Sequence, residues 1–325
     1  MSNGMPRMRN ILVIVAVGIF LVILPRFIGD YFVHLATTVF FFGYLAMAWN
    51  ILGGYAGQFS FGHAAFFGVG AFTSSLLQIH AGVNPWIGMI LAGIAGMLVG
   101  LFIGSLSFRF GLRGAYFALT MLALAEMLRL IAVQVCTVRY PLGINIPIKG
   151  NSLLHFQFTS KVPYYYIMLI MMAAVLCLTY VIERKKIGSY FKAIRENEEA
   201  AESLGINLFN YKLLAMAISS FLTAVGGTFY AQYYLIIDEE GAFGVMVSIE
   251  ILLGPIIGGA GTVFGPILGA GVLEFLSEFA RNILGGYSGI HLMVYGAILI
   301  VVIIFLPSGI LGGLKLAYSK LGKRG

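Results

Sequence analysis

The chain has 325 residues, of which 20 are Lys or Arg and 13 are Asp or Glu, so charged residues make up 10% of it and the formal net charge is +7. A soluble globular protein carries about 25% charged residues, whereas hydrophobic residues reach 60% here, with 42 glycines in addition. This composition excludes an ordinary soluble domain, because too few polar side chains are available to cover a water-exposed surface. The sequence therefore predicts a protein whose solvent is lipid.

Ten apolar runs follow one another along the chain, separated by short polar loops. They are Ile11–Leu24, Tyr31–Leu52, Phe59–Leu77, Trp86–Leu106, Ala115–Val135, Pro163–Ile182, Leu213–Ile237, Val247–Ile257, Val263–Phe275 and His291–Leu306. The eighth and ninth runs are short and interrupted by Gly and Pro. Since one crossing takes roughly 20 residues, we predict an all-α fold, a polytopic transmembrane helical bundle of about 8–10 spans with broken or re-entrant Gly-rich segments.

The first run follows Arg7 and Arg9 and resembles a signal peptide, but no small-residue cleavage site follows it, so we expect a retained first helix. If all ten runs cross from a cytoplasmic amino terminus, 14 of the 20 Lys and Arg residues fall in cytoplasmic loops and five in outer loops, with Arg129 alone inside a span. This asymmetry satisfies the positive-inside rule and predicts that both termini are cytoplasmic. The basic residues lie in short loops without interleaved aromatic residues, so they predict topology and not a nucleic-acid site.

The segment Gly53–Gly70 is rich in glycine and holds the polar residues Gln58, Ser60 and His63. Glycine permits helix breaks and close helix approach, and non-helical backbone at membrane depth occurs beside protein or water. One interpretation is that the three polar side chains line or gate a translocation path. The other is that the glycines serve tight packing, while Gln58 and His63 satisfy neighbouring backbone groups.

Two Gly-rich parts of the chain have weakly similar sequences. Ala56–Gly62 is similar to Ala260–Gly265 when a one-residue gap is allowed. Duplicated transporters show such similarity between their halves, but the shared Gly-rich composition of membrane segments is the simpler explanation.

Glu126 and Arg129 stand three residues apart in the fifth run, on one face of the expected helix. We expect a structural ion pair, since pairing lowers the cost of burying both charges; a gate or a subunit contact is the alternative. The five histidines and two cysteines show no metal-ligand spacing, and no G-x-x-x-x-G-K-[ST] phosphate loop is present. The sequence thus predicts no catalytic residue, no metal site and no cofactor in this chain, which is not expected to be an enzyme.

The loop 183–212 is the largest polar stretch expected on the cytoplasmic side. Its part Arg195–Gly205 predicts one short helix, with acidic residues early, where the helix dipole favours them, and Gly205 closing it in a left-handed cap. Ile194, Ala201 and Leu204 are expected on one face, with the small Ala200 beside them. The helix either docks against another protein or lies as an amphipathic connector on lipid headgroups.

Glu199-Ala200-Ala201, followed by three residues and Gly205, resembles the EAA-x-x-x-G loop of ABC importer permeases. Its surroundings resemble the LivM-type permeases of branched-chain amino acid importers, and similar signatures occur in order along nearly the whole chain. These are Gly53–Gly68, Leu112–Thr120, Ser248–Leu253 and Pro307–Gly312. Two departures from the family pattern, Thr137–Asn145 and Pro255, leave the solute open among branched-chain amino acids, amides, urea and aromatic acids.

The resemblance implies a single transmembrane permease domain, 1–325, in a bacterial inner membrane. It implies a LivH-like permease partner, two cytoplasmic ATP-binding subunits similar to LivG and LivF that hold ATP and Mg²⁺, and a periplasmic or extracellular solute-binding protein. The loop 183–212 would couple to the ATPase through Arg195, Glu199, Ala200, Ala201 and Gly205. Branched-chain amino acids are the leading solute.

Two other classes of function remain open at this point. An ion-coupled secondary transporter or channel needs an ionisable group near mid-membrane, and Glu126 is the only central acid that can serve. A membrane scaffold without transport would tolerate replacement of Glu199 or Gly205 with no effect on uptake.

Overall fold

The computed structural model describes residues 16–141 and 143–283, together with positions 293, 296, 297, 300 and 309–313. Within these residues the chain is mostly helical, and seven helices are long and apolar enough to cross a membrane. The elements that form them are α2 (Asp30–Asn50) continued by the π-helical turn η2 (Ile51–Tyr55), α3 (His63–Ala81), α4 (Pro85–Arg109), α5 (Gly114–Arg139), α6 (Val162–Arg184), α9 (Leu208–Tyr234), and α10 (Glu239–Phe243) with α11 (Val245–Gly258). The predicted all-helical, polytopic fold is confirmed.

The other described elements are short or carry more charge. They are η1 (Leu24–Arg26), β1 (Ile144–Asn145), η3 (Leu153–His155), α7 (Lys186–Glu196), α8 (Glu198–Ser203), β2 (Ile236–Ile237) and α12 (Gly265–Ile283). Of the first predicted run, the described part forms a shorter apolar helix, Ala16–Arg26. The ninth run corresponds to α12, which is not among the seven spans, and the tenth, His291–Leu306, lies largely outside the described residues.

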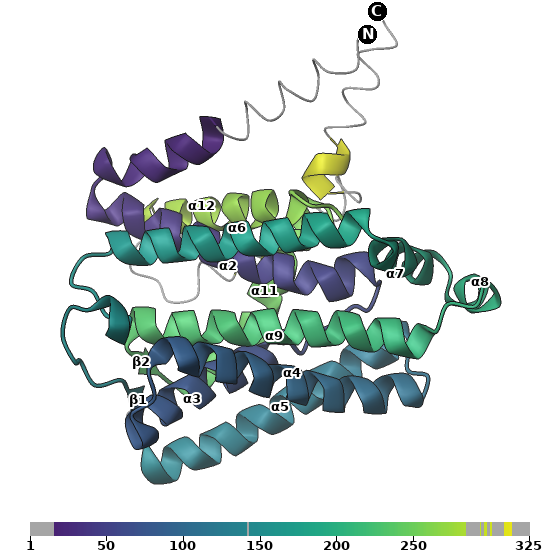
Figure 1. The fold of residues 1–325 in the computed structure, drawn as a ribbon, viewed down its shortest axis with the longest axis horizontal. Helices are drawn as coiled ribbons and strands as arrows, with labels where there is room; N and C mark the ends of the chain where they lie inside the picture. The colour runs from purple at the N-terminus through teal and green to yellow at the C-terminus, as the bar shows by residue number, and fades with distance from the viewer. Residues whose placement is uncertain are drawn as a thin grey trace, which may run out of the picture.

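The long helices run side by side along the long axis of the molecule (Figure 1). In this view α9 lies in the middle, with α3, α4 and α5 on one side and α2, α6 and α12 on the other. The helices α7 and α8 lie at one end of the bundle, and the antiparallel pair β1–β2, with Ile144 opposite Ile237, lies at the other (Figure 1). The polar loop 183–212 is thus held apart from the two-stranded sheet by the full length of the bundle.

Close backbone approach explains why α9 packs so extensively against α3 and α4. A Cβ atom added to Gly70 of α3 would lie 2.0 Å from the Ala224 carbonyl oxygen of α9, and one added to Gly227 of α9 would lie 2.1 Å from the Phe67 carbonyl oxygen of α3. On α4, a Cβ atom added to Gly96 would meet the Cβ atom of Ala224. Small residues at helix crossings are typical of membrane proteins, where van der Waals packing replaces the hydrophobic effect between helices.

Replacing Gly227 with alanine is therefore expected to destabilise the fold by about 1–3 kcal/mol or more, because the added methyl group meets backbone and not a movable side chain. The measurement is the thermal unfolding temperature of the detergent-purified chain. The control is Gly43→Ala in α2, where the nearest atoms to an added Cβ lie 3.7–3.8 Å away. This control should be neutral or slightly stabilising, since alanine has the higher helix propensity. Equal unfolding temperatures for both variants would contradict the packing argument.

The predicted break in the Gly-rich segment lies between α2 and α3. The helix α2 widens into the π-helical turn η2, and residues 56–62 are not helical. The Trp49 indole nitrogen donates to the Ser60 carbonyl oxygen at 2.8 Å and holds this loop against α2. The chain is helical again from His63, so Gly57, with φ at +71°, belongs to the break, whereas Gly70 belongs to a helix crossing.

The prediction of one helix over Arg195–Gly205 was wrong. Two helices occur, α7 and α8, separated at Asn197, whose backbone is extended. The reason is local: Asn197 is a favourable N-cap, and its side-chain oxygen accepts from the Ala200 amide at 3.0 Å. Arg195 therefore belongs to the last turn of α7, and Glu199, Ala200 and Ala201 belong to α8.

Candidate functional site

The short helix α8 is closed at both ends by its own sequence. Its start is capped by Asn197, and just past its end, at Ser203, Gly205 adopts φ of +82°. The amide of Ile206 donates to the Ala201 carbonyl oxygen at 3.1 Å, as in a Schellman motif. The predicted left-handed cap at Gly205 is confirmed. The capping preferences of Asn197 and Gly205 therefore account for both ends of this short helix.

Glu198 joins α8 to three other parts of the bundle. One carboxylate oxygen lies 2.8 Å from Arg113 Nε, just before α5, and the other lies 2.5 Å from Lys212 Nζ on α9. The Gln58 amide, from the break between α2 and α3, donates to Glu198 at 3.2 Å. Since Lys212 is 5% exposed, its charge depends on this carboxylate. The sequence analysis did not single out Glu198, Arg113 or Lys212, because their positions are far apart in the chain.

Arg195, at the end of α7, contacts two glycine turns at once. Its Nη1 donates to the Gly54 carbonyl oxygen at 2.9 Å. A Cβ atom at Gly57 would lie 2.7 Å from Arg195 Cγ, and one at Gly261 would lie 2.1 Å from Arg195 Nη1. Both glycines have positive φ, +71° and +76°, so each position excludes a side chain by conformation and by space.

Asn50, a fully buried residue at the end of α2, fastens the second of these turns to the helix that leads into the first. Its side-chain oxygen accepts from the Gly261 amide at 2.7 Å, and its side-chain nitrogen donates to the Thr262 carbonyl oxygen at 2.9 Å. The two segments with similar sequences, Ala56–Gly62 and Ala260–Gly265, thus each place a left-handed glycine against the same arginine, Arg195. A movement of α7 would reach both turns.

One face of α8 is left uncovered by the chain itself. The Glu199 side chain is 85% exposed, and Ala200 and Gly205 are also exposed. Ala201 is buried, as is Ile194 of α7, but Leu204 is 80% exposed, so its predicted place on the same face as these two was wrong. The break at Asn197 changes the direction of the chain, and the helical spacing does not continue across it.

A hollow of about 490 Å³ lies beside the side of α8 that carries Glu198 and Glu202. It is bordered by the segment between α4 and α5, by α8 and by the start of α9. The residues that define these three sides are Phe108, Leu112, Arg113, Glu202, Gly205 and Phe209.

The three polar residues predicted for a translocation path are all buried. Gln58 bonds Glu198, as above, while His63 bonds Ser219 of α9 through Nε2 at 2.8 Å and Ser60 through Nδ1 at 3.2 Å. Ser219 in turn donates to the Ala48 carbonyl oxygen of α2 at 2.7 Å. These bonds tie α2, α3 and α9 together near the break, and none of the three predicted residues borders the hollows of this subsection.

Glu126 and Arg129 lie side by side on α5, with Arg129 Nη2 2.6 Å from Glu126. The guanidinium has a second partner, Glu240 of α10, at 3.2 Å. This shared cation connects α5 to α10, a contact between positions 111 residues apart. The sequence spacing predicts the first partner, but only the fold supplies the second.

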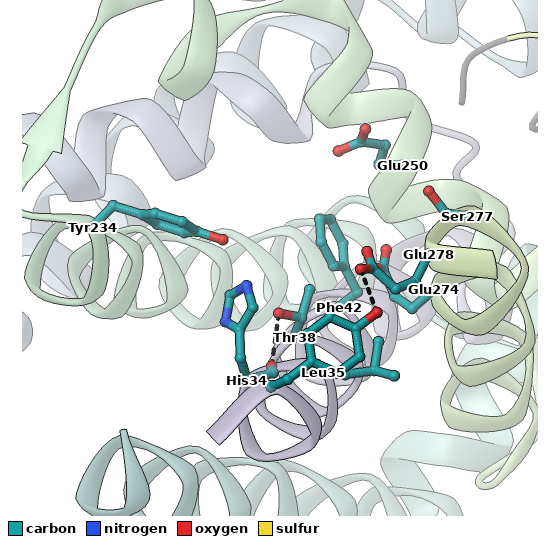
Figure 2. A pocket seen from close by; sticks show the side chains of 10 residues that line it. His34, Leu35, Thr38, Phe42, Tyr234, Glu250, Glu274, Ser277 and Glu278 are labelled. Atoms are coloured by element: carbon teal, nitrogen blue, oxygen red, sulfur yellow. Dashed lines mark hydrogen bonds between the residues drawn. The ribbon is translucent and has the colours of Figure 1, made fainter. Parts of the chain in front are cut away.

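Two further hollows lie between α2 and the helices around it. The first, of about 220 Å³, is shown in Figure 2 and has mostly polar walls, among them His34, Thr38, Glu250 and Glu274. Tyr31 and Glu278 both line it, and the Tyr31 hydroxyl donates to the Glu278 carboxylate at 2.7 Å. The second hollow, of about 320 Å³, has mostly aromatic and aliphatic walls.

These two hollows were missed by the sequence analysis, although a signal existed. The α2 residues that line them are Tyr31, His34, Leu35, Thr38, Phe41, Phe42 and Leu45. They recur every three or four positions, as residues on one helix face do. Polar side chains on one face of an apolar run mark a face turned toward protein or water.

Comparison with known proteins decides the family. Residues 31–303 match the family described as the permease component of the branched-chain amino acid transport system. The chain belongs to this family. The permease LivM of the high-affinity branched-chain amino acid transport system of Escherichia coli K12 is 25% identical over 323 residues, covering 92% of this chain and 74% of LivM.

Two other relatives match a shorter stretch of this permease. LivH of the same Escherichia coli system is 29% identical over 140 residues, 43% of this chain and 44% of LivH. The ribose import permease protein RbsC of Haemophilus influenzae is 29% identical over 143 residues, 42% of this chain and 43% of RbsC. No solved structure matches the chain.

As a member of this family, the protein is a multi-pass ABC permease subunit without ATPase activity, and ATP is handled by separate subunits. The described residues contain no group of three or more His, Cys, Asp or Glu side chains that could hold a metal ion. The permease therefore needs a mechanical connection to the subunits that use ATP.

Proposed function

We propose that this permease is one transmembrane subunit of an ATP-driven importer that carries branched-chain amino acids or related small solutes by alternating access. Its partners in this proposal are a LivH-like permease, two ATP-binding subunits similar to LivG and LivF, and a solute-binding protein outside. The similarity to LivM and LivH supports the solute class and the paired permease.

The observation that carries the proposal is the way α8 is held on the helix bundle. Its inner side is fastened by Glu198, while Glu199, Ala200 and Gly205 remain open to a partner. We assign Glu199, Ala200 and Gly205 to the docking surface for the ATPase, and Ala201 to the contact that holds α8 on the bundle. ATP and Mg²⁺ would be bound by the ATPase and not by this chain.

Movement of the docked ATPase would reach the membrane part by two routes. One passes from Glu198 to Arg113 and Lys212, and so to α5 and α9. The other passes from Arg195 to the turns at Gly54 and Gly261. In this scheme Gln58 acts beside Glu198 in coupling, and Ser60 and His63 hold the break that the movement reaches.

The end of the bundle with α7 and α8 would face the cytoplasm, and with it both termini. This end is strongly basic, with Arg109, Arg113, Arg184, Lys185, Lys186, Lys192, Arg195 and Lys212 in or next to its loops. Such enrichment is typical of cytoplasmic loops.

The test is uptake of radiolabelled leucine into proteoliposomes that hold the complete complex, loaded with the solute-binding protein. We expect uptake only with ATP and with both ATPase subunits. A panel of isoleucine, valine, alanine, amides and urea defines the solute. Uptake by this chain alone under a proton or sodium gradient would instead establish the ion-coupled alternative, and labelling of α8 from the outer side would exclude docking to a cytoplasmic ATPase.

A further inference from the structure

Of the seven spans, α5 is the one that the rest of the chain covers least. It lies at the edge of the bundle, at an angle to the neighbouring helices (Figure 1). Its charged pair, Glu126 and Arg129, is only partly covered, and 37% of the Glu126 side chain is exposed. The surroundings of this pair therefore depend on what lies outside the chain.

The pair lies near the middle of the membrane. Glu126 is twelve residues from Gly114, where α5 begins, and thirteen from Arg139, where it ends. At 1.5 Å per residue, about 18–20 Å of helix separates it from each end, and the hydrocarbon core is roughly 30 Å thick. Ionisable side chains at this depth are rare, and they face the interior of a bundle or a water-filled cavity. Lipid tails are thus unfavourable surroundings for Glu126.

A second exposed charge lies beside the pair. Glu240 of α10 lies 3.2 Å from Arg129, and its side chain is 66% exposed. The same short helix reaches far down α3, because the Phe243 ring packs against Phe72 with ring centroids 5.2 Å apart. Phe72 is nine residues before the end of α3 at Ala81. The helix α10 therefore carries its acidic residues into the outer half of the bundle and not across its end.

The two exposed flanks of α5 differ in polarity at the same depth. The flank with the ion pair turns toward α10. The opposite flank, about a third of a turn away, carries the apolar residues Leu124, Met127 and Ile131. Its Thr120 donates to the Tyr116 carbonyl oxygen of its own helix at 2.8 Å, so no polar neighbour is needed there. Lipid suits this apolar flank and not the charged one.

Charge balance favours water over a second protein on the charged flank. The carboxylates of Glu126 and Glu240 share the guanidinium of Arg129, so these three groups together carry a net charge of −1. A protein that covered them would bury this charge at a cost unless it supplied a cation, whereas water solvates it. Glu240 also lines the apolar hollow of about 320 Å³, together with Phe67 and Met246. The exposed charges thus lead to an open space between the helices.

From these observations we infer that the charged flank of α5 lines a water-filled recess, open to the outer side of the membrane, through which solute passes to the apolar hollow. Glu126, Arg129 and Glu240 keep the recess hydrated down to the middle of α5, and Glu240 stands beside the hollow. The inference rests on the proposed function, which supplies the solute and the direction of the bundle in the membrane.

Two adjacent residues of α5 test the recess. Leu130 and Ile131 lie at the same depth and are 56% and 55% exposed, but Leu130 lies one turn after Glu126, on its side of the helix. Leu130→Cys and Ile131→Cys are made in a chain with Cys136 and Cys177 replaced by alanine. The complete complex in right-side-out vesicles is treated with a membrane-impermeant thiosulfonate. Leu130→Cys should react about tenfold faster or more, because only a thiolate reacts and apolar surroundings suppress its formation.

Both cysteine variants leave the ion pair intact and should keep the unfolding temperature of the cysteine-free chain. Equal reaction rates at the two positions, whether fast or slow, would overturn the recess. A cross-link between Leu130→Cys and the partner permease would also overturn it, since this flank would then be a contact between subunits.

The passage of solute is tested by side-chain size. Leu130→Trp narrows the recess and should lower leucine uptake by the complete complex, whereas Ile131→Trp, on the apolar flank, should leave uptake unchanged. Equal uptake by both variants would overturn the passage of solute along this flank. The labelling itself needs no transport. Rapid labelling of Leu130→Cys in a complex without ATP-driven uptake would therefore overturn the proposed importer and support the recess.

Discussion

Replacing Glu198 with alanine should reduce ATP-driven uptake at least about tenfold and lower the unfolding temperature of the isolated chain. Lys212, 5% exposed, would lose its carboxylate partner, as would Arg113. Removing one partner of a buried ion pair costs about 3–5 kcal/mol, and we expect the lower end because Arg113 is half exposed. The measurements are thermal unfolding in detergent and leucine uptake by the complete complex.

A double variant separates stability from coupling. Glu198→Ala combined with Lys212→Met leaves no buried lysine charge, so the unfolding temperature should recover in part. Uptake should stay low, because α8 is no longer fastened to α9. Glu202→Ala, an exposed residue of the same helix, is the control for stability. If the Glu198→Ala complex takes up solute at the normal rate, the network is not part of coupling.

Replacing Arg195 with alanine should uncouple ATP hydrolysis from uptake, so that less solute enters per ATP hydrolysed. The substitution removes the hydrogen bond to the Gly54 carbonyl oxygen and the contact with the turns at Gly57 and Gly261. The unfolding temperature should change little, since the Arg195 side chain is 34% exposed and one hydrogen bond contributes about 1 kcal/mol. Arg195→Lys should restore coupling only partly, because an ammonium group lacks the planar fork of a guanidinium.

The Gly261→Ala substitution should disturb the same contact, between Arg195 and the turn at Gly261, by changing the glycine and not the arginine. Its methyl group would lie 2.1 Å from Arg195 Nη1 and should displace the guanidinium. We expect the uncoupling of Arg195→Ala, and no further loss when the two changes are combined. Gly82→Ala is the matched control: its φ is also positive, +64°, but nothing lies within 4 Å of an added Cβ. An equal defect in both glycine variants would indicate backbone strain and not the contact with Arg195.

Several features of this permease follow from neighbouring residues alone. The seven spans lie close to the predicted apolar runs, because lipid requires continuous apolar helix wherever the chain crosses. The cap at Gly205 follows from the left-handed conformation that glycine tolerates. The family follows from motifs that recur in order along the sequence.

Other features depended on which distant residues the fold brings together. Glu198 meets Gln58 across 140 positions, and Asn50 meets Gly261 across 211. Local periodicity carries no information about such pairs. It also could not show that Asn197 divides the expected helix, because a capping side chain and a continuing helix compete at that position with similar energies.

The sequence by itself determined that this chain is an all-helical membrane permease, since solvent, helix length and motif order are properties of neighbouring residues. Only the tertiary structure decided which side chains fasten α8, which glycines surround Arg195, and where the hollows along α2 lie. These depend on the packing of helices far apart in the chain, and in lipid that packing is selected by shape and by the pairing of buried polar groups.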